Sequence, residues 1–225
     1  MSALELDPDL AHAEYRSTEL RAPKRAPLVV PMGEVEKTGP LYGPTDVDPS
    51  EADLTRQAHG EPLGERIIVT GRVLNGDGTP VPNVLVEIWQ ANAAGRYAHQ
   101  GDQHPAPLDA NFHGAGRCVT DARGEYRFVS IKPGAYPWRN HHNAWRPAHI
   151  HFSLFGRNFT ERLITQMYFP GDPLFALDPI FNSVPAEGRD LMVSTFDIEV
   201  TEPEWALGYR WDIVLRGQRA TPMER

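Results

Sequence analysis

The segment Arg146–Phe152, RPAHIHF, places two histidines two residues apart among apolar residues. Residues i and i+2 of a β-strand point to the same face, so we expect His149 and His151 to project together and Ile150 to project the opposite way. Buried imidazoles need polar partners, because an unpaired buried polar group is costly. A metal ion satisfies two neutral imidazoles at once, and imidazole binds zinc, copper, iron and nickel. The pair therefore indicates a metal site, although two solvent-facing histidines on a polar strand face are the simpler interpretation.

The other histidines and acids supply no third ligand at a familiar spacing. The first acidic residue after His151 is Glu161, and no histidine follows, so the pattern of a cupin-like site is absent. A zinc–thiolate site is excluded because Cys118 is the only cysteine. The remaining histidines lie in polar or turn-rich segments, and we do not expect them to be ligands: His12, His59, His99, His104, His113, His141 and His142.

Two tyrosines are further candidates. Tyr136 lies between Gly134 and Pro137, and a residue before proline is held extended, which fixes the direction of its side chain. Tyr97 follows an apolar segment at the start of a long connection. A lone tyrosine is more simply explained as a core aromatic whose hydroxyl is hydrogen-bonded nearby, and the residues alone favour that interpretation.

The elements that must position these residues have the period of β-strands. From Arg66 onward, alternating β-branched and polar residues are separated by turn residues, which predicts an all-β fold with a β-sandwich core and long functional loops. The turn NGDG, residues 75–78, predicts a hairpin between the first two strands. The long connections 91–116 and 132–147 are expected to carry function. The expected strands are Arg66–Leu74, Asn83–Gln90, Glu125–Ser130, Ala148–Phe155, Leu163–Phe169, Thr195–Val200 and Tyr209–Gly217.

Residues 1–62 have a different composition. They hold eight prolines and few apolar pairs at helical spacing, so we expect an extended, proline-rich N-terminal arm that makes subunit contacts. Residues 63–225 then form the β-sandwich domain that carries the candidate residues. Within the arm, PSEADLTRQAH predicts a short helix over Pro49–His59 with Ser50 as its N-cap.

Composition excludes several classes of protein. The 225 residues carry a formal net charge of −8, which argues against a nucleic-acid binder but not against a basic pocket for an anionic substrate. No run of eighteen apolar residues predicts a membrane span, and the N-terminal residues lack the pattern of a secretory signal. With a single cysteine, an intrachain disulfide is impossible, and we expect a cytoplasmic protein.

Five separated segments in the same order carry a family resemblance: WQANAAGRY, IKPGAYPWRN, WRPAHIHF, LITQMYFPGDP and YRWDIVLRGQR. Together they resemble the β subunits of the intradiol ring-cleaving dioxygenases that act on protocatechuate, from about residue 60 onward and more weakly in the arm. The resemblance implies a non-haem Fe(III) held by Tyr97, Tyr136, His149 and His151. It implies Tyr136 and His151 as axial ligands and the other two as equatorial ligands.

The same resemblance assigns roles around the metal. Tyr136 also acts in catalysis by taking a substrate proton, and Arg146 stabilises negative charge that develops on the substrate ring. The residues implied in substrate binding are Tyr15, Trp138, Gln166, Tyr168 and Ile180. Trp89 and Arg139 are implied as supporting residues, and Arg139 is expected to order the segment around Tyr136.

The implied reaction is intradiol cleavage of protocatechuate (3,4-dihydroxybenzoate) with O2 to 3-carboxy-cis,cis-muconate, in aromatic catabolism through the β-ketoadipate pathway. The implied partner is a homologous α subunit in an (αβ)n hetero-oligomer. A catechol or hydroxyquinol 1,2-dioxygenase is the nearest alternative, although the proline-rich arm does not resemble the N-terminal helical segment of those enzymes. From other classes, a non-enzymatic β-sandwich binding module leaves the histidines unexplained. A zinc or Fe(II) enzyme would need a third histidine or a carboxylate ligand.

Overall fold

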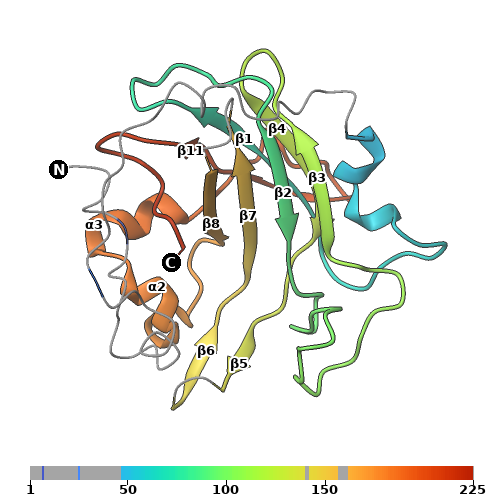
Figure 1. The fold of residues 1–225 in the computed structure, drawn as a ribbon. Helices are drawn as coiled ribbons and strands as arrows, with labels where there is room; N and C mark the ends of the chain where they lie inside the picture. The colour runs from blue at the N-terminus through green and yellow to red at the C-terminus, as the bar shows by residue number, and fades with distance from the viewer. Residues whose placement is uncertain (1–6, 8–24, 26–46, 140–141, 157–161, 225) are drawn as a thin grey trace.

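Two β-sheets packed face to face form the body of the protein in a computed structural model, which describes residues 7, 25, 47–139, 142–156 and 162–224 (Figure 1). The first sheet is antiparallel throughout and carries the histidine segment. Its strand order is β3 (Ala115–Val119), β2 (Leu85–Trp89), β7 (His149–Phe155) and β8 (Arg162–Tyr168). The predicted all-β sandwich is confirmed.

The second sheet is built around β1 (Arg66–Leu74), which pairs antiparallel with β4 (Glu125–Ile131) along one edge. Along its other edge β1 pairs in parallel with β10 (Leu207–Arg210) and then with β11 (Ile213–Val214). The short strand β9 (Thr195–Phe196) pairs with β10. A separate ribbon of β5 (Tyr136–Trp138) and β6 (Ala144–Arg146) extends beyond the N-terminal end of β7 (Figure 1).

The core between the sheets fixes which face of β7 is free for chemistry. Ile150, Phe152 and Leu154 are fully buried and pack with Val69 of β1 and Phe128 of β4 in one cluster. Burying side chains of this size contributes roughly 1.5–3 kcal/mol each, so this register is strongly preferred. The histidines between them therefore lie on the outer face of the first sheet, as the spacing predicts.

The predicted hairpin between the first two strands is wrong. β1 pairs with β4, β10 and β11, whereas β2 pairs with β3 and β7 in the other sheet. The turn itself forms, because the amide of Gly78 donates to the carbonyl of Asn75 at 2.9 Å. The pairing with β1 continues only briefly, since the amide of Val81 donates to the carbonyl of Val73 at 2.8 Å. Pro82 follows and has no N–H to continue a ladder, so the chain crosses to the second layer.

Two strand boundaries near the C-terminal end also differ from expectation. The strand expected over Thr195–Val200 ends at Phe196, and the one expected over Tyr209–Gly217 is divided into β10 and β11. Three strands lie in or at the edge of the expected long connections: β3, β5 and β6. Short helical turns fill the segment between β8 and β9: η5 (Phe175–Leu177), α2 (Pro179–Ser183), α3 (Ala186–Arg189) and η6 (Asp190–Met192).

The helix expected over Pro49–His59 is instead two 3-10 turns, η3 (Pro49–Ala52) and η4 (Leu54–Arg56). Ser50 as the N-cap is wrong: the Asp48 side chain accepts from the amide of Ser50, and Asp53 caps the second turn. Most of the predicted arm, including Tyr15, lies outside the described residues. Within the described ranges, no helix is long and apolar enough to cross a membrane.

Gly71 of β1 offers a test of the packing between β1 and the chain that joins β10 to β11. A Cβ at this position would lie 1.8 Å from the carbonyl oxygen of Trp211, which is backbone and cannot rotate away. We predict that Gly71→Ala lowers the free energy of unfolding by about 3 kcal/mol, measured by urea denaturation. Gly78→Ala is the control, because that site is open and only its φ of +83° costs about 1 kcal/mol. Equal losses in the two variants would contradict this packing.

Candidate metal centre

The outer face of the first sheet presents a row of polar and aromatic side chains around the two histidines. His151 pairs across the strands with Trp89 of β2 and Gln166 of β8, and His149 pairs with Tyr168. The Trp89 indole stacks on the His151 ring with centroids 4.9 Å apart and planes 7° apart. This stacking restricts the tilt of the imidazole, which agrees with the supporting role expected of Trp89.

Tyr97 reaches the same face from a loop and Tyr136 from the start of β5, and the backbones just before the two tyrosines are in contact. Asn92 orders the loop, because its Oδ1 accepts from the amides of Ala94 and Arg96 at 2.9 Å each. Gly95 has φ +77°, and a Cβ there would lie 2.4 Å from the carbonyl oxygen of Ala135, the residue before Tyr136. Only glycine permits this approach, so the two tyrosines are positioned together.

The four predicted ligand side chains converge. The Tyr97 hydroxyl lies 3.1 Å from Nε2 of His151 and 3.4 Å from Nε2 of His149. The Tyr136 hydroxyl lies 3.4 Å from the same His149 nitrogen. Donor atoms about 2.1 Å from a shared ion are separated by ~3.0–3.4 Å when their angles at the ion are about 90–110°. The donor set and its spacing therefore fit one first-row metal ion.

Both histidines have their other ring nitrogen beside an acceptor. Nδ1 of His149 lies 2.7 Å from the carbonyl oxygen of Pro147, and Nδ1 of His151 lies 3.3 Å from Oε2 of Glu224. A carbonyl or carboxylate oxygen only accepts, so Nδ1–H donates and Nε2 keeps its lone pair. Burial, helped by the charge of Arg146, holds the pKa of His149 well below its usual value. Its neutral imidazole is therefore ready to bind a cation.

Burial acts on the two phenols in the opposite direction. It raises the pKa of Tyr97 well above its ordinary value, and the proximity of Tyr136 raises it further. Burial also raises the pKa of Tyr136, although the charge of Arg146 opposes the effect. Without a cation between them the phenols stay protonated, so ionising them at neutral pH requires a strongly charged metal ion.

Arg146 lies beneath this cluster in a buried polar network. Its Nε is 3.1 Å from Oδ1 of Asp178, and both side chains are almost completely buried. Its Nη2 donates to Gln166 and, at 3.2 Å, to the hydroxyl of Tyr168. Burial alone would lower the pKa of Arg146, but the Asp178 carboxylate and the neighbouring phenols raise it well above its usual value. The site therefore contains a permanent positive charge.

Asp178 links this arginine to the short helix beside the site. Its Oδ2 accepts from the Tyr168 hydroxyl at 3.1 Å, and its Oδ1 accepts from the amide of Ile180 at 2.9 Å. It is thus the N-cap of α2, which carries Ile180. One carboxylate therefore fixes both the expected catalytic arginine and the expected substrate-side isoleucine.

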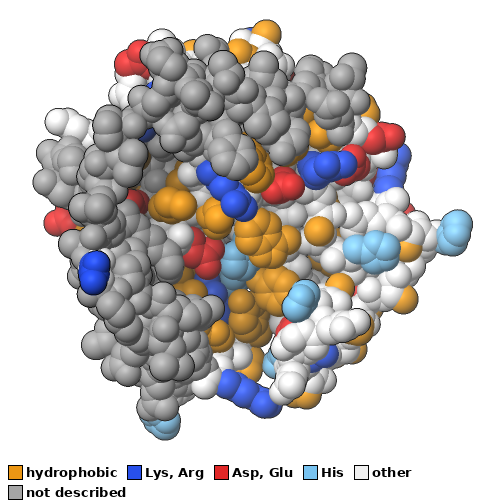
Figure 2. Space-filling model, in the orientation of Figure 1, with side chains coloured by type: hydrophobic (Ala, Val, Ile, Leu, Met, Phe, Trp, Pro, Cys, Tyr) orange, Lys and Arg blue, Asp and Glu red, His pale blue; other side chains and the backbone are white. Residues whose placement is uncertain are grey.

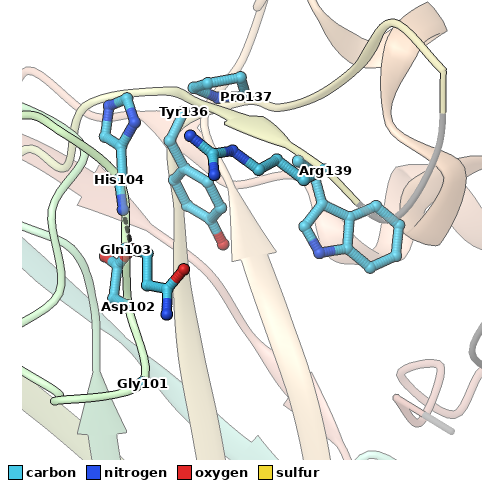
Figure 3. Close-up of a pocket in the computed structure, with 8 residues that line it drawn as sticks. Gly101, Asp102, Gln103, His104, Tyr136, Pro137 and Arg139 are labelled. Carbon is cyan, nitrogen blue, oxygen red and sulfur yellow. Dashed lines mark hydrogen bonds between the residues drawn. The ribbon is translucent and has the colours of Figure 1, made fainter.

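A pocket of about 270 Å³ opens beside Tyr136, lined also by Trp138, Arg139, Asp102 and His104 (Figure 3). Asp102 organises its wall, since its carboxylate accepts from the amides of Tyr97 and His104, each at 2.8 Å. On the same side of the molecule, hydrophobic side chains gather around a hollow that also exposes histidine and charged side chains (Figure 2). The pocket gives a ligand a route to Tyr136.

Most of the residues expected at the site are brought together, but not all in the expected manner. Gln166 and Tyr168 are fully buried and hydrogen-bonded to Arg146, whereas Arg139 is exposed at the pocket. Tyr15 and His141 lie outside the described residues, and His142 is exposed. Sequence reasoning missed three acids that contact the expected site residues: Asp102, Asp178 and Glu224.

Comparisons with known proteins identify the family to which the chain belongs. Residues 37–217 match a family model described as Dioxygenase. The chain is 60% identical over 220 residues to the protocatechuate 3,4-dioxygenase beta chain of Burkholderia cepacia, covering 97% of this chain and 94% of that protein. It is 30% identical to the protocatechuate 3,4-dioxygenase alpha chain of the same organism, over 70% of this chain and 76% of that one.

The fold is similar to that of a solved structure, the 3-chlorocatechol 1,2-dioxygenase of Rhodococcus opacus 1CP. The TM-score is 0.56 at 22% identity, covering 84% of this chain and 69% of that one. At this identity the likeness speaks for the fold alone, and it agrees with the two-sheet architecture.

The Arg146–Asp178 pair generates a prediction about stability. Removing one partner of a buried ion pair leaves an uncompensated charge, so Asp178→Ala should lower the free energy of unfolding by about 3–5 kcal/mol. The control is Glu202→Ala, which breaks a pair with Arg127 at 3.1 Å whose side chains are about half exposed, and should cost less than about 1 kcal/mol. Urea denaturation of both variants measures the difference. If Asp178→Ala lowers the free energy of unfolding no more than Glu202→Ala does, Asp178 does not compensate a buried charge on Arg146.

Proposed function

This chain belongs to the intradiol dioxygenase family, and on that premise we propose that it cleaves protocatechuate between its two hydroxyl-bearing carbons, using O2, to give 3-carboxy-cis,cis-muconate. The observation that carries the proposal is the meeting of two phenol oxygens and two imidazole nitrogens at separations of 3.1–3.4 Å. The 60% identity to a protocatechuate 3,4-dioxygenase beta chain, over nearly the whole chain, supports this substrate among the catechols.

The proposed metal is a non-haem Fe(III) held by Tyr97, Tyr136, His149 and His151. Phenolate is a hard, anionic oxygen donor that suits a trivalent ion, and the two histidines supply neutral nitrogen donors. When bound, ferric iron supplies the positive charge that ionises both the phenols and the substrate hydroxyls. The protein contributes the geometry, because each donor is fixed by a strand or by a tightly packed loop.

Tyr136 has a second role as a proton acceptor. Its burial favours the protonated phenol whenever its oxygen is not held by a cation. As a catechol binds, the ionised Oη of Tyr136 would accept one hydroxyl proton, so the phenolate becomes a neutral phenol while the substrate becomes a monoanion, and the charge at the centre is unchanged. Tyr97 would remain among the side chains that hold the metal.

Arg146 stabilises negative charge on the substrate ring. It remains protonated, and the buried carboxylate of Asp178 together with Gln166 and Tyr168 holds it in one position. A preorganised charge of this kind needs no reorganisation during the reaction. Gln166 and Tyr168 act mainly by supporting this arginine on the side of the site that faces the substrate.

The walls of the substrate site come from loops on the outer face of the sheet. Trp138, whose ring centroid lies 5.9 Å from the Arg146 guanidinium carbon, and Ile180 of α2 flank the aromatic ring. Arg139 orders the segment around Tyr136 at the pocket. Tyr15 of the arm contributes near the substrate carboxylate.

The chain acts as the β component of an αβ hetero-oligomer. Relatives of both kinds support this assembly, the beta chain at 60% identity and the alpha chain at 30%. Residues 1–62 form the arm that contacts the α subunit, and residues 63–225 form the catalytic domain. We place the protein in the cytoplasm, since its single cysteine gives it no intrachain disulfide.

Product analysis under 18O2 tests the proposed function. The chain, co-expressed with its α partner, should convert protocatechuate to 3-carboxy-cis,cis-muconate with both labelled atoms incorporated. Catechol and hydroxyquinol, which lack the carboxylate, should react with a kcat/KM lower by at least about tenfold. A preference for catechol or hydroxyquinol would show that the proposed substrate is wrong. If no catechol led to oxygen consumption, the assignment as a dioxygenase would be wrong.

Tyr136→Phe tests the proton-accepting role. The variant keeps three metal-binding side chains and should retain iron, whereas kcat should fall about 10²-fold or more because a general base is lost. Tyr209→Phe, at a buried tyrosine in the other sheet, is the matched control and should keep wild-type turnover. Iron content and steady-state oxygen uptake measure both effects. Unchanged kcat in Tyr136→Phe would leave its hydroxyl without a catalytic role.

A further inference from the structure

We infer that Glu224 is a positioning residue for the metal centre, which holds the His151 ring so that its Nε2 faces the bound iron. The inference rests on the proposed function, because it assigns a task to a side chain that contacts one of the proposed ligands. Glu224 lies 73 positions after His151, and no motif in the sequence connects the two.

The contact between the side chains of Glu224 and His151 decides which ring nitrogen of His151 has a free lone pair for a metal ion. Oε2 of Glu224 lies 3.3 Å from Nδ1, and the side chains of His151 and Glu224 are 12% and 26% exposed. The carboxylate accepts, so Nδ1 carries the proton and Nε2 carries the lone pair. That Nε2 lies 3.1 Å from the Tyr97 hydroxyl, on the side where the four donors meet.

The comparison with His149 shows why a side chain is needed. Nδ1 of His149 donates to the backbone carbonyl of Pro147 at 2.7 Å, so the chain itself fixes that ring. His151 has no backbone acceptor of this kind among the described residues. The Trp89 stack fixes the plane of the His151 ring but not which nitrogen faces the tyrosines. Glu224 supplies the missing acceptor.

The segment that carries Glu224 is tied to the sandwich on both sides. The amide of Glu224 donates to the carbonyl of Ile164 in β8 at 2.7 Å, and the amide of Thr221 donates to Val214 in β11 at 2.9 Å. The amide of Met223 donates to Oδ1 of Asp7 at 2.9 Å. These bonds bring the carboxylate to the outer face of the first sheet, so its position is built into the fold.

A carboxylate that accepts from a metal-bound histidine fixes the tautomer and raises the basicity of the ring, and losing such a partner typically costs 10–100-fold in metal affinity. Glu224 should therefore affect the binding of iron and the electronic state of the centre, while leaving the folding of the metal-free protein unchanged. A residue with only a structural role would instead affect the folding of the metal-free protein and leave iron binding and the electronic state of the centre unchanged.

The test uses the purified αβ protein and measures iron affinity by competition with a chelator, the visible absorption of the iron–tyrosinate centre, and the melting temperature of the metal-free form. Glu224→Ala should weaken iron binding 10–100-fold and shift the absorption band. Glu224→Gln, whose amide oxygen still accepts, should fall between Glu224→Ala and the wild type. Asp212→Asn is the matched control, since Asp212 pairs with Arg72 at 3.0 Å and is 33% exposed, and it should change none of the three.

Wild-type affinity and absorption in Glu224→Ala would overturn the inference, and so would a loss of iron that is matched by a lower melting temperature without metal. If the wild type is coloured and active while both Glu224 variants behave like it, only this inference fails. If the wild type binds no ferric iron, the proposed function fails together with it.

Discussion

The two-residue period of β7 is the constraint on which the rest of the molecule depends. Its even-numbered residues, Ile150, Phe152 and Leu154, are fixed in the core, so His149 and His151 must share the outer face. A shift of one residue would exchange the two sets and would bury the imidazoles in the apolar core. The hydrophobic energy of the sandwich thus positions two metal-binding nitrogens without any contribution from the metal.

Segments outside β7 supply the phenol groups and the charged side chains of the site. A loop and the start of β5, in backbone contact, bring in the phenols, and a network of buried polar groups surrounds the donors. In this network a positive charge on Arg146 is compensated by Asp178, while burial keeps the phenols protonated and His149 neutral. Apart from the Glu224 carboxylate beside His151, the arrangement carries no excess negative charge until a cation enters. It therefore favours an ion with enough charge to ionise two phenols, which distinguishes it from a site built on carboxylates.

Features of the fold and the site could be predicted where they depend on residues close together in the sequence. The histidine pair and the strands around it follow from a two-residue period, which a single segment displays. The β1–β2 hairpin failed because the turn residues alone do not show that Pro82 ends the pairing just after the turn. The N-cap at Ser50 failed because the turn begins earlier, with Asp48 as its N-cap and Ser50 already inside it, donating its amide to Asp48. Tyr97 and Tyr136 were ambiguous as residues, and only the family resemblance favoured them as ligands over core aromatics.

The acids around the site could not be found in this way. Asp178 and Glu224 reach Arg146 and His151 from distant segments, one in a short helix and one after the last strand. The sequence separation between each acid and its partner matches no motif, because the contact forms only when the sandwich is assembled. The same holds for Asp102, which contributes to the site by accepting a hydrogen bond from the backbone amide of Tyr97.

The central claim is that Tyr97, Tyr136, His149 and His151 bind ferric iron and that protocatechuate binds directly to it. The most direct measurement is the visible spectrum of the αβ protein, recorded before and after adding protocatechuate without oxygen. The account predicts a red-purple absorption from iron bound to tyrosinate, and a shift of this band when protocatechuate is added. A colourless protein, or a band that protocatechuate leaves unchanged, would contradict it.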